Sequence, residues 1–433
     1  MLATLASIAA LLLGALIMLL GTSLLGIVLP LRMSAVGFST EVTGIVMAAY
    51  FAGLLAGSVY GKRVIGEVGH IRAFAGFAAI MAAAALAYPM QIGPLSWGLL
   101  RFIGGFCVAG VFAAIESWLN ERASNETRGR ILSVYMVNNY LGIMLGQLMV
   151  NLWDIGSSEV FMMASLLTSL SLVPVVLTRV AAPDISQIKP LSLAALYRAS
   201  PLGVIGSLAS GTALGGYYGL GAIFAEQIGF SIFEVSLFMG SVILGGLLLQ
   251  WPIGRISDRY DRRKVLLVLL LILVAACASG AVTLLLEQTF PLLLGVGLLL
   301  GGTMMCIYPI AVSQAYDHLT PDRYVGASSG LLLAYSIGAT AGPVLCGIAM
   351  SRLGPQAFFG FIVGVALLLT GFVLYRLRAR EAVPLAEREA FVALPRMSPA
   401  VAELDPRAAA SAPGNPPSAG PPAESPRKAP DQE

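Results

Sequence analysis

Long apolar stretches follow one another along almost the entire chain, with short polar segments between them. A helix rises about 1.5 Å per residue, so about 20 apolar residues cross the roughly 30 Å hydrocarbon core of a membrane. The strand-length segments of alternating polarity that form membrane barrels are missing from the sequence. We therefore predict an all-α integral membrane protein with twelve transmembrane helices, at residues 7–30, 40–60, 72–92, 95–118, 129–151, 159–178, 201–224, 235–253, 265–286, 291–315, 325–350 and 356–376.

The charges support a membrane location and indicate an orientation. Only 11% of the residues are charged, whereas soluble domains carry about 25%. With the N-terminus placed in the cytoplasm, the cytoplasmic loops hold fifteen Lys and Arg residues and the outer loops hold two, Arg32 and Arg352. Because cytoplasmic loops of membrane proteins carry an excess of positive charge, we expect both termini to be cytoplasmic.

Changes in composition divide the chain into four parts. Residues 179–200 form the longest loop between spans, so we expect a central cytoplasmic loop there. An N-terminal six-helix bundle is predicted over residues 1–178 and a C-terminal six-helix bundle over residues 201–376. Residues 377–433 contain eleven prolines with many alanines and scattered charges. Such a composition cannot bury a core, so we expect a disordered cytoplasmic tail without chemistry of its own.

Glycines at matching positions indicate that the two halves are repeats. Gly57 and Gly254 each begin a polar loop after an apolar stretch, and they lie 197 residues apart. A second set has an offset of 196 residues: Gly142 and Gly146 in the first half, Gly338 and Gly342 in the second. Halves related by an axis along the membrane normal are a known transporter architecture.

The loop after the eighth span carries the most specific motif. It reads Gly254-Arg-Ile-Ser-Asp-Arg-Tyr-Asp-Arg-Arg-Lys and resembles motif A of the major facilitator superfamily, G-x-x-x-D-R-x-x-R-R/K. In the first-half copy from Gly57, Gly61 stands where the motif has Asp. The stretches VGHIRAF and ESWLNER resemble the bacterial YcaD-like branch of that family. The resemblance covers residues 7–376 and implies two pseudo-symmetric six-helix bundles in a bacterial inner membrane.

The resemblance also implies a conformational latch at this motif. Asp258 would accept hydrogen bonds from the start of the fifth span, near Arg128, where the helix dipole favours a carboxylate. The motif's arginines would pair with Asp317, and Glu116 would be its counterpart in the first half. The other residues expected in the latch are Gly57, Lys62, Arg63, Arg72, Gly254, Arg259, Arg262 and Arg263. The alternative is a solvated basic loop that only sets the topology.

Arg101 is the only basic residue well inside a span. Since a charge at the centre of a span costs at least about 2.5 kcal/mol on insertion scales, such a residue normally faces protein or water. Its context, Arg101-Phe-Ile-Gly-Gly105, resembles motif B of the family, whose arginine is implicated in proton-coupled transport. The alternative is a side chain that snorkels to the outer surface, about six residues away, a distance of roughly 9 Å along a helix.

Several polar and aromatic side chains are further candidates for a solute site. Asn138 and Asn139 in the fifth span could hydrogen-bond a solute or only a neighbouring helix. Family geometry lines a central cavity with spans one, four, seven and ten, where the candidates are Thr22, Ser23, Tyr217, Tyr218, Thr303 and Tyr308. A core role is the alternative for each of them.

The motifs favour transport over catalysis. The two histidines have no metal-ligand spacing, and neither a phosphate-binding loop, a nucleophile with its base nor a nucleic-acid motif is present. We predict a secondary transporter, without enzymatic activity, cofactor or metal, that moves a small solute by alternating access as a monomer. A coupling proton or ion stays open, because no carboxylate lies in the middle of a span. The alternatives are a multidrug-type efflux antiporter, for which Gln147 replaces the expected proline, and a non-transporting receptor or assembly factor.

Overall fold

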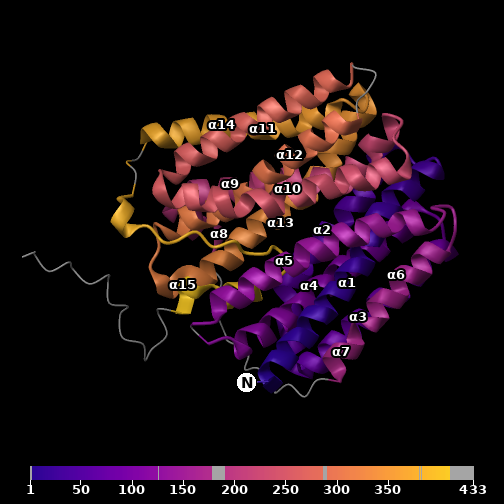
Figure 1. The fold of residues 1–433 in the computed structure, drawn as a ribbon, viewed down its shortest axis with the longest axis horizontal. Coiled ribbons are helices and arrows are strands. Elements are labelled where there is room, and N and C mark those ends of the chain that lie inside the picture. The colour runs from indigo at the N-terminus through magenta and orange to yellow at the C-terminus, as the bar shows by residue number, and fades with distance from the viewer. Residues whose placement is uncertain are drawn as a thin grey trace, which may run out of the picture.

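The computed structural model describes residues 2–124, 126–177, 191–285, 290–379, 381 and 383–409. Long helices lie side by side along one direction of the molecule (Figure 1). The first half contains α1 (Leu2–Ala35), α2 (Thr40–Val68), α3 (His70–Ala87), α4 (Pro94–Arg122), α5 (Arg128–Leu148), α6 (Glu159–Leu170) and α7 (Leu172–Val176). After the short helix α8 (Leu193–Ala199), the second half contains α9 (Pro201–Gln227), α10 (Ile232–Arg259), α11 (Arg262–Thr283), α12 (Phe290–Tyr316), α13 (Tyr324–Leu353) and α14 (Ala357–Ala379).

Several helices begin where the sequence supplies a capping side chain. The Ser39 hydroxyl accepts a hydrogen bond from the backbone N–H of Val42 at the start of α2, over 3.3 Å. Ser231 and Glu234 form a reciprocal capping box at the start of α10. These side chains satisfy N–H groups that have no partner within the helix. The loops before α2 and α10 therefore end at a defined residue, which fixes where these two helices enter the bundle.

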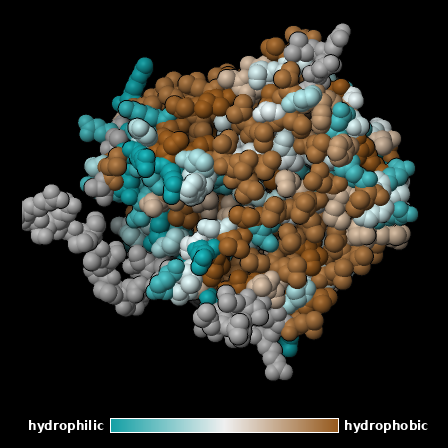
Figure 2. All heavy atoms as spheres, in the orientation of Figure 1, coloured by the Kyte–Doolittle hydropathy of each residue, from teal (hydrophilic) through white to brown (hydrophobic). Residues whose placement is uncertain are grey.

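Eleven of the helical segments in the described part of the chain are long and apolar enough to cross a membrane. They include a span in which α6 continues into α7, and the twelfth predicted span is α9. Helix α9 is 27 residues long but contains seven glycines as well as serine, threonine and tyrosine, which lowers its hydropathy. Most of its residues are buried among other helices. The predicted fold of twelve membrane helices is confirmed, and Figure 2 shows apolar side chains over most of the visible face, with hydrophilic ones toward its ends.

The packing of the helices repeats between the halves. Helix α1 packs on α5, α2 on α4 and α3 on α6, and the second half repeats these pairs as α9 on α13, α10 on α12 and α11 on α14. The repeated glycines lie at these contacts. A Cβ atom on Gly146 would lie 2.6 Å from the carbonyl oxygen of Leu20, and one on Gly342 would lie 2.2 Å from that of Thr212. The offset of 196 residues therefore reflects a shared need for close helix approach.

The two halves contact each other directly through α2 with α13 and α5 with α10. Close contacts lie at the end of the bundle that carries the α1–α2 and α9–α10 loops, which we call the far face. There the Gln227 amide donates to the Thr40 hydroxyl over 3.0 Å, and the Asn151 amide donates to the Ser236 hydroxyl over 2.8 Å. The opposite end, which includes Lys62 and Arg259, is called the basic face.

The structure differs from the predicted disordered tail. Residues 377–379 complete α14, and the following described residues form η4 (Leu385–Glu387), η5 (Pro399–Leu404) and α15 (Pro406–Ala409). This segment, on the left in Figure 1, lies on the basic face. Its apolar residues Leu394, Val401 and Leu404 are at most 2% exposed. Two short apolar runs within a proline-rich sequence therefore find a surface to bury, while residues 410–433 lie outside the described part.

Candidate functional site

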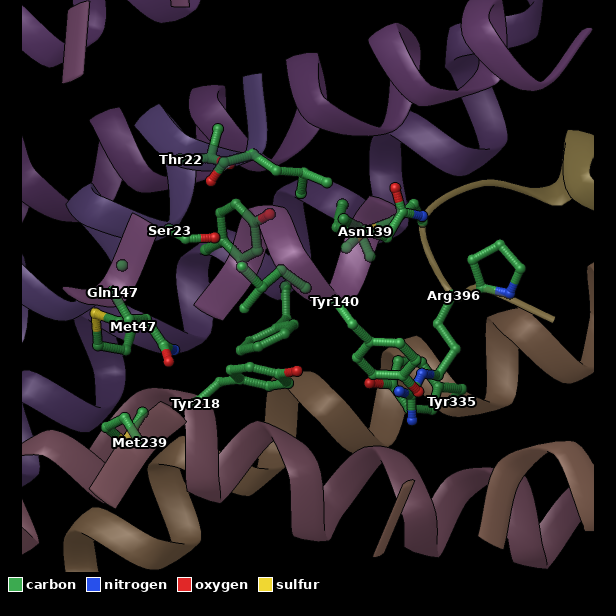
Figure 3. A pocket seen from close by; sticks show the side chains of 18 of the residues that line it. Thr22, Ser23, Met47, Asn139, Tyr140, Gln147, Tyr218, Met239, Tyr335 and Arg396 are labelled. Atoms are coloured by element: carbon green, nitrogen blue, oxygen red, sulfur yellow. Dashed lines mark hydrogen bonds between the residues drawn. The ribbon is translucent and has the colours of Figure 1, made fainter. Parts of the chain in front are cut away.

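A cavity of about 140 Å³ lies between the two halves. Side chains from α1, α2, α4 and α5 of the first half and from α9, α10 and α13 of the second half line it, together with three residues of the tail. Figure 3 shows amide, hydroxyl, aromatic and thioether groups turned toward one another here. None of the residues that line the cavity in the described structure is acidic.

Arg101 on α4 lines this cavity and is 6% exposed. Its guanidinium carbon lies 4.5 Å from the ring centroid of Tyr50, so the positive charge rests on an aromatic face. Among the described residues its Nε atom has no hydrogen-bond partner. The side chain is thus held inside the protein, which argues against snorkelling to the far face. An unpaired donor at the cavity wall can bind an anionic or carbonyl group of a solute.

The two neighbouring asparagines of α5 have different surroundings. The Asn138 amide donates to the carbonyl oxygen of Leu12 on α1 over 3.1 Å, so it joins two helices. Asn139 lines the cavity, where its amide lies beside the Tyr135 hydroxyl and its side-chain oxygen has no well-aligned hydrogen-bond partner within the described structure. Gln147, two turns further along α5, also lines the cavity and has an unpaired side-chain oxygen. Asn139 and Gln147 therefore provide polar groups that a solute can satisfy.

The paired tyrosines of α9 also separate into two roles. Tyr217 is fully buried, and its hydroxyl donates to the carbonyl oxygen of Met239 over 2.6 Å. Tyr218 lines the cavity instead. Thr22 and Ser23 on α1 line it as well, although the Thr22 hydroxyl donates to the carbonyl oxygen of Met18 on its own helix.

Three further tyrosines of the site were not among the candidates from the sequence. Tyr50, Tyr140 and Tyr335 line the cavity from α2, α5 and α13. The Tyr140 hydroxyl donates to the Gln250 side chain across the two halves over 2.7 Å. Tyr308 lies behind Tyr335, with 5.2 Å between the ring centroids. The family resemblance predicts a cavity lined by spans one, four, seven and ten, whereas these three tyrosines lie on other spans. The sequence signal that they share is an aromatic residue near the middle of a membrane span.

Part of the predicted latch is assembled at the basic face. Arg262 and Asp317 are nearly inaccessible, and the Arg262 Nε atom lies 2.8 Å from a carboxylate oxygen of Asp317. Burial raises the pKa of Asp317, and the guanidinium of Arg262 opposes that rise. Arg263 pairs with Asp261 over 2.8 Å, and Arg259 is exposed. The structure thus brings one motif arginine to Asp317 and directs another to the cap of α11.

Asp258 binds the tail in this structure rather than the start of α5. Its carboxylate accepts a hydrogen bond from the backbone N–H of Phe391 over 2.8 Å and lies 3.5 Å from the guanidinium of Arg262. Gly254 makes room for the same tail residue, because a Cβ atom there would lie 2.3 Å from the Phe391 ring. The motif residues are therefore covered by residues that the sequence had suggested were disordered.

The first-half residues predicted for the latch do not form one cluster. Glu116 is completely buried and accepts hydrogen bonds from the Tyr135 hydroxyl over 3.0 Å and the Ser398 hydroxyl over 2.5 Å. Lys62 pairs with Glu403 of the tail over 3.3 Å. The remaining predicted residues lie elsewhere: Arg63 pairs with Glu67, Arg72 is exposed and Gly57 packs against Phe106.

The repeated halves and the cavity between them define a membrane transport protein. The chain belongs to the Major Facilitator Superfamily, whose sequence model matches residues 11–240 and 203–417. It is 29% identical over 355 residues to proteins described as "Uncharacterized MFS-type transporter YcaD" from Escherichia coli and Shigella flexneri, covering 82% of this chain and 91% of theirs. The predicted likeness to the YcaD branch is thereby confirmed.

Solved structures share the fold at low sequence identity. The nucleoside transporter NupG matches with a TM-score of 0.70 and 14% identity, covering 88% of this chain and 100% of that one. A bacterial homologue of the human lysosomal transporter Spinster, in an inward-facing and occupied conformation, matches with a TM-score of 0.67 and 15% identity over 88% and 97% of the two chains. The protein is therefore an MFS-type transporter of unknown substrate, a multi-pass membrane protein related to bacterial transporters.

Proposed function

We propose that this protein is a secondary transporter that carries a small solute across the bacterial cytoplasmic membrane by alternating access, as a monomer. The observation that supports this most is the cavity at the junction of the repeated halves, where Arg101, Asn139 and Gln147 present buried polar atoms without hydrogen-bond partners in the described structure. Buried polar atoms are normally paired. A solute that pairs them would therefore bind in preference to water or lipid.

The contacts between the halves suggest which side of the cavity is closed. At the far face, the Gln227–Thr40 hydrogen bond joins α9 to α2, and the close approach of Gly44 to Pro343 joins α2 to α13. The described tail lies against both halves at the basic face instead. We take the basic face to be cytoplasmic, in accordance with its positive charge. In transport the halves would rock, so that the far-face contacts break and Asp258 moves from the tail to the start of α5.

A cross-link across the far face tests this mechanism. Asn151 and Ser236 contact each other there through their side chains, so Asn151→Cys with Ser236→Cys can be joined by a short cleavable reagent. Alternating access predicts that the cross-link stops flux, and that reduction of the cross-link restores it. The single Asn151→Cys variant treated in the same way is the control. The solute is first found by screening compounds for those that raise the unfolding temperature of the purified protein.

Two outcomes of the cross-linking experiment distinguish alternating access from other mechanisms. With the far face cross-linked, a cysteine introduced at Ser23 in the cavity should react from the basic side only. The four native cysteines are buried and provide a low background. Undiminished flux through the cross-linked protein would contradict alternating access.

A further inference from the structure

The tail places one side chain inside the cavity. Arg396 lies among aromatic rings from both halves, with its guanidinium carbon 5.6 Å from the ring centroid of Tyr335 (Figure 3). Tyr140 and Tyr218 line the same cavity, and the Tyr308 ring packs against Tyr335, with 5.2 Å between the two ring centroids. We call Tyr140, Tyr218, Tyr308 and Tyr335 the tyrosine cage.

The chemistry of the tyrosine cage suits a cation. In the described structure Arg396 takes part in no ion pair, and no acidic residue lines the cavity. Among the described residues, the contact of its charge that can be measured is therefore with the aromatic face of Tyr335. Aromatic cages of this kind recognise ammonium groups of ligands, because the face of each ring carries partial negative charge.

Arg101 sets a second requirement for the solute, namely a negatively charged group. It lines the same cavity, and its Nε atom has no hydrogen-bond partner among the described residues. A solute with positive charge only would be repelled by this guanidinium, whereas a solute that also carries an anionic group would pair with it. The cavity thus combines a place for a cation with a donor for an anion.

We propose that the tyrosine cage is the cation subsite of the solute cavity, and that the solute is a small zwitterion whose anionic group pairs with Arg101. Arg396 of the tail occupies the cage and competes there with the positive group of the solute. This inference rests on the proposed function, since it assigns a solute class to the same cavity. The tail is then an inhibitory segment that leaves when solute binds.

The tail is held by contacts with both halves. In the first half, the Ser398 hydroxyl donates to Glu116 and Lys62 pairs with Glu403. In the second half, the contacts include those of the Phe391 N–H with Asp258, the Glu389 N–H with Asp317, Arg388 with the Tyr260 carbonyl, and Arg407 with the Ser313 hydroxyl and the Tyr316 ring. A segment attached to both halves at the basic face must detach before that face can close.

Arg396 itself is held less well than the rest of the tail. Its Nη1 atom is buried and has no hydrogen-bond partner within the described structure, and a buried donor without a partner is unfavourable. An alkylammonium or guanidinium group of a free solute can turn in the cage to find acceptors that the tethered side chain cannot reach. A solute can therefore displace the Arg396 side chain from the cage, although other residues attach the tail firmly to the helices.

The test compares four forms of the purified protein: the full chain, a chain ending at residue 380, and full chains with Arg396→Ala or Arg388→Ala. Arg388 is the matched control, because it belongs to the same tail but donates to the carbonyl oxygens of Val383 and Tyr260 outside the cavity. The probes are L-arginine, which carries both charges, and agmatine, which lacks the carboxylate. The first readout is the rise in unfolding temperature with each probe.

The second readout is the reaction rate of a cysteine introduced at Ser23 with a maleimide, in each of the four backgrounds. We expect removal of Arg396, by truncation or by Arg396→Ala, to raise both the labelling rate and the affinity for L-arginine by about threefold to thirtyfold. The apparent affinity is the intrinsic affinity multiplied by the fraction of cavities that the tail leaves free, and this range corresponds to a free fraction of about one third to one thirtieth. The Arg388→Ala chain loses one attachment of the tail, to Tyr260, but keeps Arg396 in the cavity, so its labelling rate and affinity should change much less. Tyr335→Leu should abolish the response to L-arginine, and Tyr335→Phe should keep most of it.

Several results would overturn the proposal. Equal responses of the Arg396→Ala and Arg388→Ala chains would show that Arg396 does not compete. Absence of any stabilisation of the truncated and Arg396→Ala chains by L-arginine would refute the cation subsite, and equal stabilisation by agmatine would refute the role of Arg101. None of these readouts requires flux, so a protein that passes them but carries no solute would contradict the proposed function alone.

Discussion

Gly105 allows α2 and α4 to touch through their backbones, and this contact can be tested directly. A Cβ atom at Gly105 would lie 2.0 Å from the carbonyl oxygen of Tyr50 and 2.9 Å from the backbone nitrogen of Leu54. Ordinary contacts of a Cβ atom begin at 3.4 Å. Gly105→Ala therefore has to push the helices apart by more than a small side-chain adjustment can absorb, because both opposing atoms are backbone. Overpacking of this kind typically costs about 1–3 kcal/mol.

The adjacent residue supplies the control. A Cβ atom at Gly104 would meet nothing within 4 Å, and alanine is favoured over glycine in a helix by up to about 1 kcal/mol. We expect Gly105→Ala to lower the thermal unfolding midpoint in detergent, and Gly104→Ala to leave it unchanged or raise it. Since Tyr50 supports Arg101 through its ring, only the Gly105 variant should also weaken solute binding. Equal midpoints for the two variants would refute the reasoning.

Two further predictions concern the basic face. Arg262→Met should destabilise the protein by about 3–5 kcal/mol, because it leaves the buried Asp317 carboxylate without its ion-pair partner, while the double variant with Asp317→Leu should recover most of the loss. Asp317→Leu alone should cost less, because Arg262 keeps Asp258 at 3.5 Å. Thermal unfolding of the three variants measures this, and simple addition of the two losses would count against a coupled pair. In the chain ending at residue 380, Asp258→Asn should increase the basic-face-open population by about twofold to thirtyfold, the equivalent of about 0.3–2 kcal/mol at a helix terminus. Labelling of a cavity cysteine from each side reports the ratio, and an unchanged ratio would mean that no latch forms.

The spans and the repeat could be predicted because they depend on local properties. Length and hydropathy mark a membrane helix wherever its neighbours lie. The approach of Arg262 to Asp317 also follows from position, since α11 begins and α12 ends at the same face. Which side of a helix faces the cavity depends instead on how the helix is rotated in the bundle. Asn138 and Asn139 are neighbours in sequence, yet one joins α1 and the other lines the cavity.

The packing of the tail could not be predicted from its composition. Prolines and alanines dominate residues 377–433 as a whole, and they conceal the short apolar runs that include Leu394 and Val401. Such runs are too short to fold alone, so they become ordered only against a surface that other parts of the chain provide. That surface consists of the ends of helices from both halves, which no reading of the tail by itself can foresee.

The glycine-rich helix α9 has a consequence for how the protein is made. Its hydropathy is low, so the hydrocarbon core attracts it weakly when it leaves the ribosome. Its main partner, α13, is synthesised only after α10, α11 and α12. When α9 emerges, the surfaces that it contacts in the finished protein and that already exist are those of α1, α2 and α8, and α10 and α12 add theirs before α13 is made. We therefore expect α9 to be held first by helices of the first half, so that correct insertion of the second half depends on a first half that is already folded.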